Sequence, residues 1–140
     1  MRQKRAMLLG FSFVELLITL GLILGMALLT YPFYVNYVRH MYFAEIIEAS
    51  VPFKTAVADC YNSTKTFKGC DAGKKPIPQN IMKAQGHVAS LVVKDGVITI
   101  RPVADKGVLC GDDLVFTPSY LNKAIVWIAS GEAVKKSYAP

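Results

Sequence analysis

The chain begins with a long apolar stretch. From Ala6 to Val38 the only formally charged side chain is Glu15. About 20 apolar residues are enough for a helix to cross a hydrocarbon core of roughly 30 Å. This stretch therefore predicts a helix that can span a membrane, with residues 11–38 as its hydrophobic part.

The helical pattern continues beyond this stretch, now with one polar face. Charged residues from Arg39 to Lys54 recur among apolar ones at helical spacing, which predicts an amphipathic helix that covers a core. Pro32 and Pro52 lie within the predicted helix. A proline removes one main-chain hydrogen bond and clashes with the preceding turn. We therefore expect a kink or local melting at both prolines.

The second half of the chain predicts a loop followed by a sheet. Residues 62–85 are rich in Lys, Gly and Pro, as loops are. Four short strands are expected, at residues 87–93, 97–102, 114–117 and 125–129. Asp95-Gly96 predicts a type I′ turn between the first two strands, and Pro118-Ser119 separates the last two. The amphipathic helix is the only large element that can cover the apolar face of such a sheet.

The predicted fold is therefore α+β. A long N-terminal helix, hydrophobic and then amphipathic, packs on a roughly four-stranded antiparallel sheet. The 140 residues suffice for one core. Charged residues make up 19%, against about 25% in ordinary soluble domains, and hydrophobic residues 53%. Because the apolar excess lies in the N-terminal stretch, a wholly soluble protein is not expected.

The charge distribution predicts a membrane orientation. Sixteen Lys and Arg against ten Asp and Glu give a formal net charge of +6, and Arg2, Lys4 and Arg5 supply half of this excess. A short basic tip before an apolar helix stays in the cytoplasm, and the chain that follows the helix crosses to the other side. We expect a single pass with an extracytoplasmic globular part.

Three cysteines, Cys60, Cys70 and Cys110, lie in this predicted exported part, where a disulfide can persist. The sequence leaves three single bridges open, as well as three free thiols. We favour the bridge between Cys60 and Cys70, because so short a loop closes with a local turn and stabilises the fold by about 2–3 kcal/mol. Cys110 is then expected to be a buried thiol, and the bridge the main tether of the Lys-rich loop.

Gly10 stands between the basic tip and the apolar helix, and Phe11 to Glu15 follow it. The apolar stretch is too long for an ordinary signal peptide, and no Ala-x-Ala cleavage site follows it. A cut after Gly10 would remove the tip and leave the helix on the mature protein. Glu15 needs compensation, because a carboxylate at a bilayer centre costs about 2.5–3.5 kcal/mol. It lies near the interface, or it pairs with the new α-amino group of Phe11 in its own or a neighbouring chain.

The segment Gly10-Phe11-Ser12-Phe13-Val14-Glu15-Leu16-Leu17, behind a short basic leader and ahead of a long apolar helix, resembles the prepilin signature of type IV pilins and pseudopilins. The short leader and Pro32, with Tyr31 and Tyr34 beside it, resemble the type IVa subclass. One feature departs from that subclass. Its C-terminal loop is usually closed by a disulfide that starts at a Trp-x-Cys strand, whereas this chain reads Trp127-Ile128-Ala129 with no later cysteine.

The resemblance implies a processing and assembly pathway. A prepilin peptidase would cut after Gly10 and methylate Phe11, and Glu15 would then act in assembly. The implied parts are a cleaved leader, a transmembrane and filament-core helix, and a globular pilin domain, at residues 1–10, 11–38 and 39–140. The implied partners are further copies of the chain, an inner-membrane assembly platform and, before assembly, the inner membrane itself. The final location would be the cell-surface pilus.

The function implied is that of a structural subunit of a type IV pilus, which supports adhesion, twitching motility or DNA uptake. The alternatives are a type II secretion pseudopilin, a minor pilin or, in a different class, a membrane-anchored extracytoplasmic binding domain. No enzyme is expected, because the sequence has no phosphate-cradling Gly-Lys motif and no nucleophile with a plausible base.

No metal or cofactor is expected either. His40 and His87 do not stand at metal-ligand spacing with a cysteine. Asp112-Asp113 resembles part of a calcium loop of major pseudopilins, but a turn with solvated carboxylates is the expected structure. A basic surface for weak contact with DNA or an anionic host surface would use six lysines, Lys65, Lys68, Lys74, Lys75, Lys135 and Lys136. Because few aromatic residues lie between these lysines in the sequence, a solvated loop is expected instead.

Overall fold

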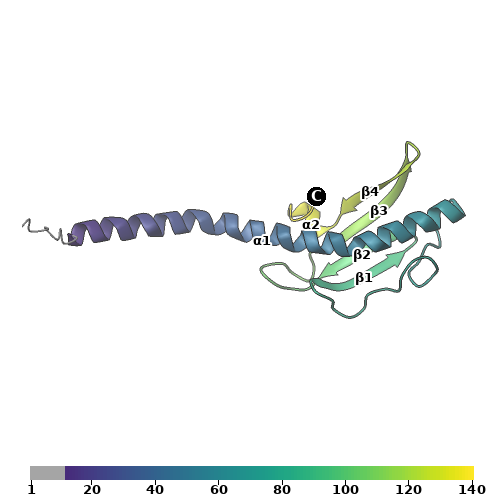
Figure 1. The fold of residues 1–140 in the computed structure, drawn as a ribbon, viewed down its shortest axis with the longest axis horizontal. Coiled ribbons are helices and arrows are strands. Elements are labelled where there is room, and N and C mark those ends of the chain that lie inside the picture. The colour runs from purple at the N-terminus through teal and green to yellow at the C-terminus, as the bar shows by residue number, and fades with distance from the viewer. Residues whose placement is uncertain (1–11) are drawn as a thin grey trace, which may run out of the picture. The chain divides into compact units, whose positions relative to one another are not determined.

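The computed structural model describes residues 12–140 of the chain (Figure 1). The described elements are two helices and four strands: α1 Phe13–Thr64, β1 Val88–Lys94, β2 Val97–Pro102, β3 Leu114–Leu121, β4 Ala124–Ser130 and α2 Glu132–Lys135. The chain separates into two compact units, which divide within α1 between Tyr34 and Val35. The limits predicted for the leader, the hydrophobic helix and the pilin domain stay predictions.

The described part of the first unit is helical from Phe13 onward, and α1 is long and apolar enough to cross a membrane. Its two threonines are satisfied within the helix. The Thr19 hydroxyl donates to the carbonyl of Glu15 at 3.0 Å, and the Thr30 hydroxyl to that of Met26 at 3.0 Å. Internal satisfaction of polar groups is what a lipid or a dry helix interface requires.

α1 is helical without interruption through both of its prolines, Pro32 and Pro52. The local melting expected there is therefore wrong for this structure. A long helix accommodates one lost main-chain hydrogen bond when the neighbouring turns on each side stay bonded. The kinks predicted at Pro32 and Pro52 stay predictions.

In the second unit, α1 lies across one face of a four-stranded antiparallel sheet in the order β1-β2-β3-β4 (Figure 1). The helix contributes Phe43, Ile46 and Val57 to the core, all fully buried. In β2 the side chains alternate, so that Ile98 and Ile100 are buried and Thr99 between them is only partly covered. The predicted α+β fold, with the amphipathic helix on an antiparallel sheet, is confirmed.

The first hairpin has the predicted turn. Lys94 pairs with Val97, and Asp95 and Gly96 between them have φ values of 48° and 77°. Positive φ at both central positions defines the type I′ turn, which suits the right-handed twist of the strands.

The break predicted at Pro118-Ser119 is wrong. β3 runs through Pro118, which lies opposite Trp127, and the turn comes later, at Asn122 and Lys123 with φ values of 50° and 63°. β2 pairs with β3 only from Leu114 to Phe116. Beyond Phe116 no strand of residues 12–140 pairs with this side of β3, and a proline without an N–H is tolerated at such an edge.

The Lys-rich loop after α1 is fixed along β1 by more than the expected bridge. The Ala72 amide donates to the carbonyl of Val93 at 3.1 Å, and the Val93 amide donates to the Asn80 side chain at 3.0 Å. Ile77 is only 4% exposed. The expectation that the disulfide is the loop's main tether is therefore wrong. The loop shares the open hydrogen-bonding edge of β1, which also protects that edge from other strands.

Candidate assembly and binding surfaces

The apolar side chains of residues 13–34 are exposed all round the helix. Leu28 and Phe33 are each 77% exposed, and most other large apolar side chains of this segment are more than half exposed. A continuous apolar surface of this size needs a cover, which a membrane or other helices can supply. This segment is the candidate assembly surface.

Glu15 lies in the first turn of α1 and is exposed. Carboxylates near a helix N-terminus are stabilised by the partial positive charge of the free amide groups there. Gly10 and Phe11 lie outside the described residues, so the cut, the methylation and the partner of Glu15 stay predictions.

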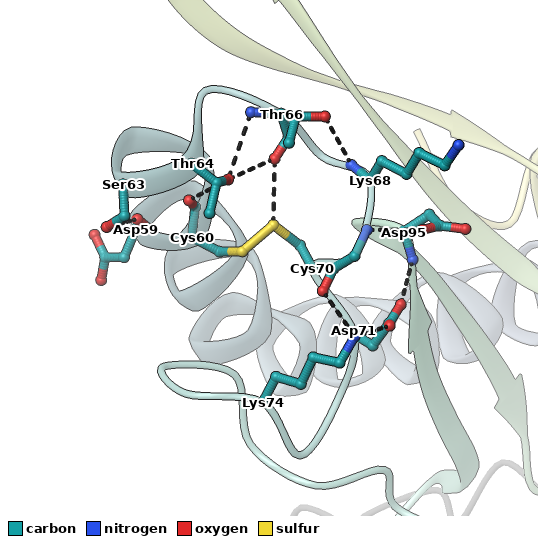
Figure 2. The surroundings of a disulfide bond; sticks show 11 residues. Asp59, Cys60, Ser63, Thr64, Thr66, Lys68, Cys70, Asp71, Lys74 and Asp95 are labelled. Atoms are coloured by element: carbon teal, nitrogen blue, oxygen red, sulfur yellow. Dashed lines mark hydrogen bonds and ion pairs between the residues drawn. A yellow bond between two sulfur atoms is a disulfide. The ribbon is translucent and has the colours of Figure 1, made fainter.

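A disulfide joins Cys60, near the C-terminal end of α1, to Cys70 in the following loop (Figure 2). Their Cα atoms are 6.1 Å apart. The Thr64 hydroxyl donates to the carbonyl of Cys60, one helical turn earlier, at 2.8 Å. Cys110 is exposed, so the expectation of a buried thiol is wrong. It lies in a loop that ends before β3 begins, outside the core that the strands build.

Two carboxylates fasten the first hairpin to this loop (Figure 2). Asp71 accepts a hydrogen bond from the Asp95 amide at 2.9 Å and pairs with the Lys74 ammonium at 2.7 Å. Asp95 in turn accepts from the Gly69 amide at 2.8 Å. The hydrogen bond from the Asp95 backbone and the bond from Lys74 lower the pKa of Asp71.

The C-terminal segment is held by an ion pair. Asp112 is buried; one of its oxygens pairs with the Lys136 ammonium and the other accepts from the Leu109 amide at 2.9 Å. The expectation of a solvated carboxylate at this position is wrong. Tyr138 stacks on Phe43 of α1, with ring centroids 5.9 Å apart, so the segment also packs on the helix. The C-terminal segment is therefore fixed without the cysteine pair usual in the type IVa subclass.

Lys54 also differs from its sequence-based interpretation, which placed it on the wet face of the helix. Its ammonium lies 3.3 Å from the centre of the Phe116 ring, and the Trp127 ring lies farther away at 5.8 Å. Burial lowers the pKa of Lys54. The contact is a cation–π interaction between α1 and β3, which spacing along the helix alone does not predict.

The two histidines stand apart. His40 is exposed, whereas His87 forms a 2.9 Å bond from Nε2 to Glu45 and its ring packs 4.1 Å from that of Tyr42. Both contacts of His87 tie the start of β1 to α1. They favour a packing role for His87.

The lysines of the predicted basic surface are divided between two places. Lys135 and Lys136 belong to the C-terminal segment and pair with Glu132 and Asp112. The other four follow α1 in the loop. Three aromatic rings lie beside that loop: the Tyr61 ring lies 4.3 Å from Phe67 and 5.1 Å from Tyr120. The rings come from α1, the loop and β3, so the structure gathers more aromatic surface beside the loop than its sequence alone contains.

Comparison with known proteins gives one consistent picture. No family model matches the chain. Over 113 residues the chain is 28% identical to "Prepilin peptidase-dependent protein D" of Escherichia coli strain K12. The aligned residues make up 81% of this chain and 74% of that protein. Its fold resembles the solution NMR structure of the major type IV pilin PpdD from enterohemorrhagic E. coli, with a TM-score of 0.55 and 25% identity over 68% of this chain and 70% of that one. The chain is thus homologous to prepilin peptidase-dependent protein D and has the type IV pilin fold.

Proposed function

We propose that this homologue of prepilin peptidase-dependent protein D is a structural subunit of a type IV pilus rather than an enzyme. The observation that carries the proposal is the apolar helix of residues 13–34, whose side chains are exposed all round and continue into the helix of a folded α+β unit. Copies of such a helix can bury their apolar surfaces against one another once they leave the bilayer, because both environments accept apolar side chains. Self-assembly is therefore the proposed activity.

In this proposal the chain is processed at Gly10. A prepilin peptidase cuts after Gly10 and methylates the amino group of Phe11. The E. coli relative is named as a prepilin peptidase-dependent protein, which supports this step. Before assembly the subunit spans the inner membrane once, with its N-terminus in the cytoplasm and residues 39–140 outside. An inner-membrane assembly platform then moves it into a filament on the cell surface.

Glu15 is the proposed assembly residue. After the cut, the amino group of Phe11 and the carboxylate of Glu15 carry opposite charges at neutral pH. A pair between neighbouring subunits would set the register of the packed helices. Both charges would then be neutralised inside the apolar filament core.

Two observations favour a pilin over the alternative, a type II secretion pseudopilin. The Cys60–Cys70 disulfide is a feature that major pseudopilins generally lack. Both carboxylate oxygens of Asp112 are engaged by Lys136 and the Leu109 amide, so a calcium ion would have to displace these partners. A minor pilin at the filament tip is a further alternative. The proposed uses of the filament are surface adhesion, twitching motility and DNA uptake.

Electron microscopy of cells tests the proposal. A strain that lacks the gene is expected to have no surface filaments of this type, and the wild-type chain supplied in trans should restore them. Antibody against residues 39–140 should label the restored filaments along their whole length. Label at the tips alone would indicate a minor pilin, and unchanged filaments in the deleted strain would contradict the proposal.

A further inference from the structure

We infer that one end of the second unit binds nucleic acid without sequence preference, through lysine contacts to phosphates and one stacking ring. This end, the lysine end, carries Lys65, Lys68, Lys74, Lys75, Lys94 and Lys123. It comprises the C-terminal end of α1, the loop that follows, and the turns of both hairpins. The inference extends the proposed use in DNA uptake, but it concerns the subunit itself and does not depend on assembly.

Hydrogen bonds and ring contacts bring these segments together. The Gly96 amide donates to the carbonyl of Cys70 at 3.0 Å, so the turn after Lys94 lies against the loop that carries Lys68 (Figure 2). The contact of the Tyr61 and Tyr120 rings, at 5.1 Å, brings the second hairpin beside the end of α1. Lysines that are distant in sequence therefore share one end of the unit.

The carboxylates at this end leave most of the positive charge uncompensated. Only three lie there, Asp59, Asp71 and Asp95, against six lysines. Asp71 is occupied by Lys74 and the Asp95 amide, and Asp95 by the Gly69 amide. Within residues 12–140, the other five lysines of the lysine end form no ion pair, and Figure 2 shows the Lys68 side chain extending away from the network around Asp71. A cluster of free cations attracts phosphates and raises the rate of encounter.

Aromatic rings also gather at the lysine end. Tyr61 stacks on Phe67, and the backbone of Gly96 packs against Phe67 so closely that an added Cβ would lie 3.1 Å from it. The far side of this stack is Tyr120, which is 49% exposed. An exposed ring together with clustered cations is the combination with which proteins hold single strands: the phosphates meet the cations and a base stacks on the ring.

The kind of cation sets the expected specificity. All six cations at the lysine end are lysines, and both arginines of the unit, Arg39 and Arg101, belong to other surfaces. Lysine acts as a flexible point charge, whereas arginine reads planar acceptors through two parallel bonds. The lysine end is therefore suited to a run of phosphates of any sequence.

The test measures fluorescence anisotropy of labelled short DNA with the full-length chain in non-ionic detergent, between about 50 and 200 mM salt. Lys68→Gln together with Lys94→Gln should weaken binding to single-stranded and double-stranded DNA and lower the salt slope by about two. The matched control is Lys83→Gln with Lys106→Gln, which removes the same amount of charge. These lysines lie before β1 and after β2, at the ends of the two strands away from the lysine end. The affinity for DNA should stay within about twofold of the wild-type value.

Substitutions of Tyr120 test the stacking contact separately from the lysine contacts to phosphates. Tyr120→Ala should weaken single-stranded binding about fivefold or more and leave double-stranded binding unchanged, while Tyr120→Phe should retain both. Circular dichroism verifies the fold of each variant. An equal loss from the control pair, no DNA binding by the wild type at low salt, or binding of a sulfated polysaccharide without DNA binding would each overturn the inference. Loss of filaments in cells with intact DNA binding in detergent would count against the proposed function alone.

Discussion

The buried carboxylate of Asp112 pairs with the ammonium of Lys136, 24 residues further along the chain. The side chain of Asp112 is 2% exposed, and that of Lys136 is 38% exposed. The pair joins the loop before β3 to the segment after α2. It therefore closes the C-terminal part of the fold without a cysteine in that segment.

Lys136→Met is expected to lower the thermal unfolding temperature, because it leaves the Asp112 carboxylate buried without its cation. Asp112→Asn with Lys136→Met should recover part of the loss, since the neutral amide needs no counter-charge. The measurement is a double-mutant cycle on thermal unfolding. Additive losses in the double variant would show that the two side chains do not interact.

The same pair gives an alkaline pH dependence. The hydrogen bond to Asp112 raises the pKa of Lys136 above its ordinary value of 10.5. Because the pKa is raised in the folded state, protonated Lys136 contributes stability at pH values below 10.5. This contribution is lost as the pH rises through the pKa of Lys136 in the folded protein. The difference in unfolding temperature between wild type and Lys136→Met should therefore shrink at strongly alkaline pH. A difference that stays constant there would contradict the assignment.

Asp71→Asn is expected to alter the acid end of the stability profile. The Asp95 amide and Lys74 lower the pKa of Asp71 below its ordinary value of 3.8. Because the pKa is lowered in the folded state, ionised Asp71 contributes stability at pH values above 3.8. This contribution is lost as the pH falls through the pKa of Asp71 in the folded protein. The variant should be less stable than wild type at neutral pH, and the gap should narrow in acid. Asp59→Asn, on the exposed face of α1, is the matched control. Its stability should depend on pH in the same way as that of the wild type.

Removal of the disulfide tests how the Lys-rich loop is held. Cys60→Ser with Cys70→Ser should lower the free energy of unfolding by about 2–3 kcal/mol, because a loop of this length gains that much freedom in the unfolded chain. The folded structure should persist, since main-chain hydrogen bonds also tie the loop to β1. Denaturant unfolding followed by near-UV circular dichroism measures both. Exposed Cys110→Ser is the control and should change stability by less than about 0.5 kcal/mol.

Local chemistry explains which parts of the fold could be predicted. Asp and Gly accept the positive φ values that a type I′ turn requires, so Asp95-Gly96 predicts the first hairpin from the sequence alone. The turn of the second hairpin was predicted too early, because Pro118 is the strongest turn signal nearby. Whether a strand can contain a proline at this position depends on how far β2 pairs with β3, which the sequence does not show. Asn122-Lys123 has no glycine to mark the turn.

The features that were missed depend on contacts between distant segments. Nothing in the sequence near Asp112 points to Lys136, and burial alone turns that carboxylate from a solvated group into a structural one. The same applies to the lysine end, where Tyr61, Phe67 and Tyr120 come from three elements. The sequence places each ring near a lysine, but only the packing of the hairpins on α1 brings the three rings together.

Glu15 provides the test that separates assembly from membrane residence. If Glu15 meets the amino group of Phe11 in a neighbouring subunit, both charges lose their water in the filament. Removal of one would leave the other buried and unpaired, at a cost of about 3–5 kcal/mol for each subunit. Glu15→Ala should enter the membrane at least as well as wild type, because an apolar side chain is favoured there. The cut at Gly10 should be retained, since the residues on both sides of it are unchanged.

The expected result for Glu15→Ala is therefore processed subunits that accumulate in the inner membrane and few or no filaments. Glu15→Gln should act in the same direction, because it keeps the shape of the side chain and loses its charge. Mass spectrometry of membrane fractions measures processing, and electron microscopy counts filaments in the same cells. Thr19→Val is a suitable control: it changes the same helical turn, and its hydroxyl bonds only within the helix. Normal filament numbers from either Glu15 variant would refute the pairing role, and loss of filaments from Thr19→Val would show that the loss is not specific to Glu15.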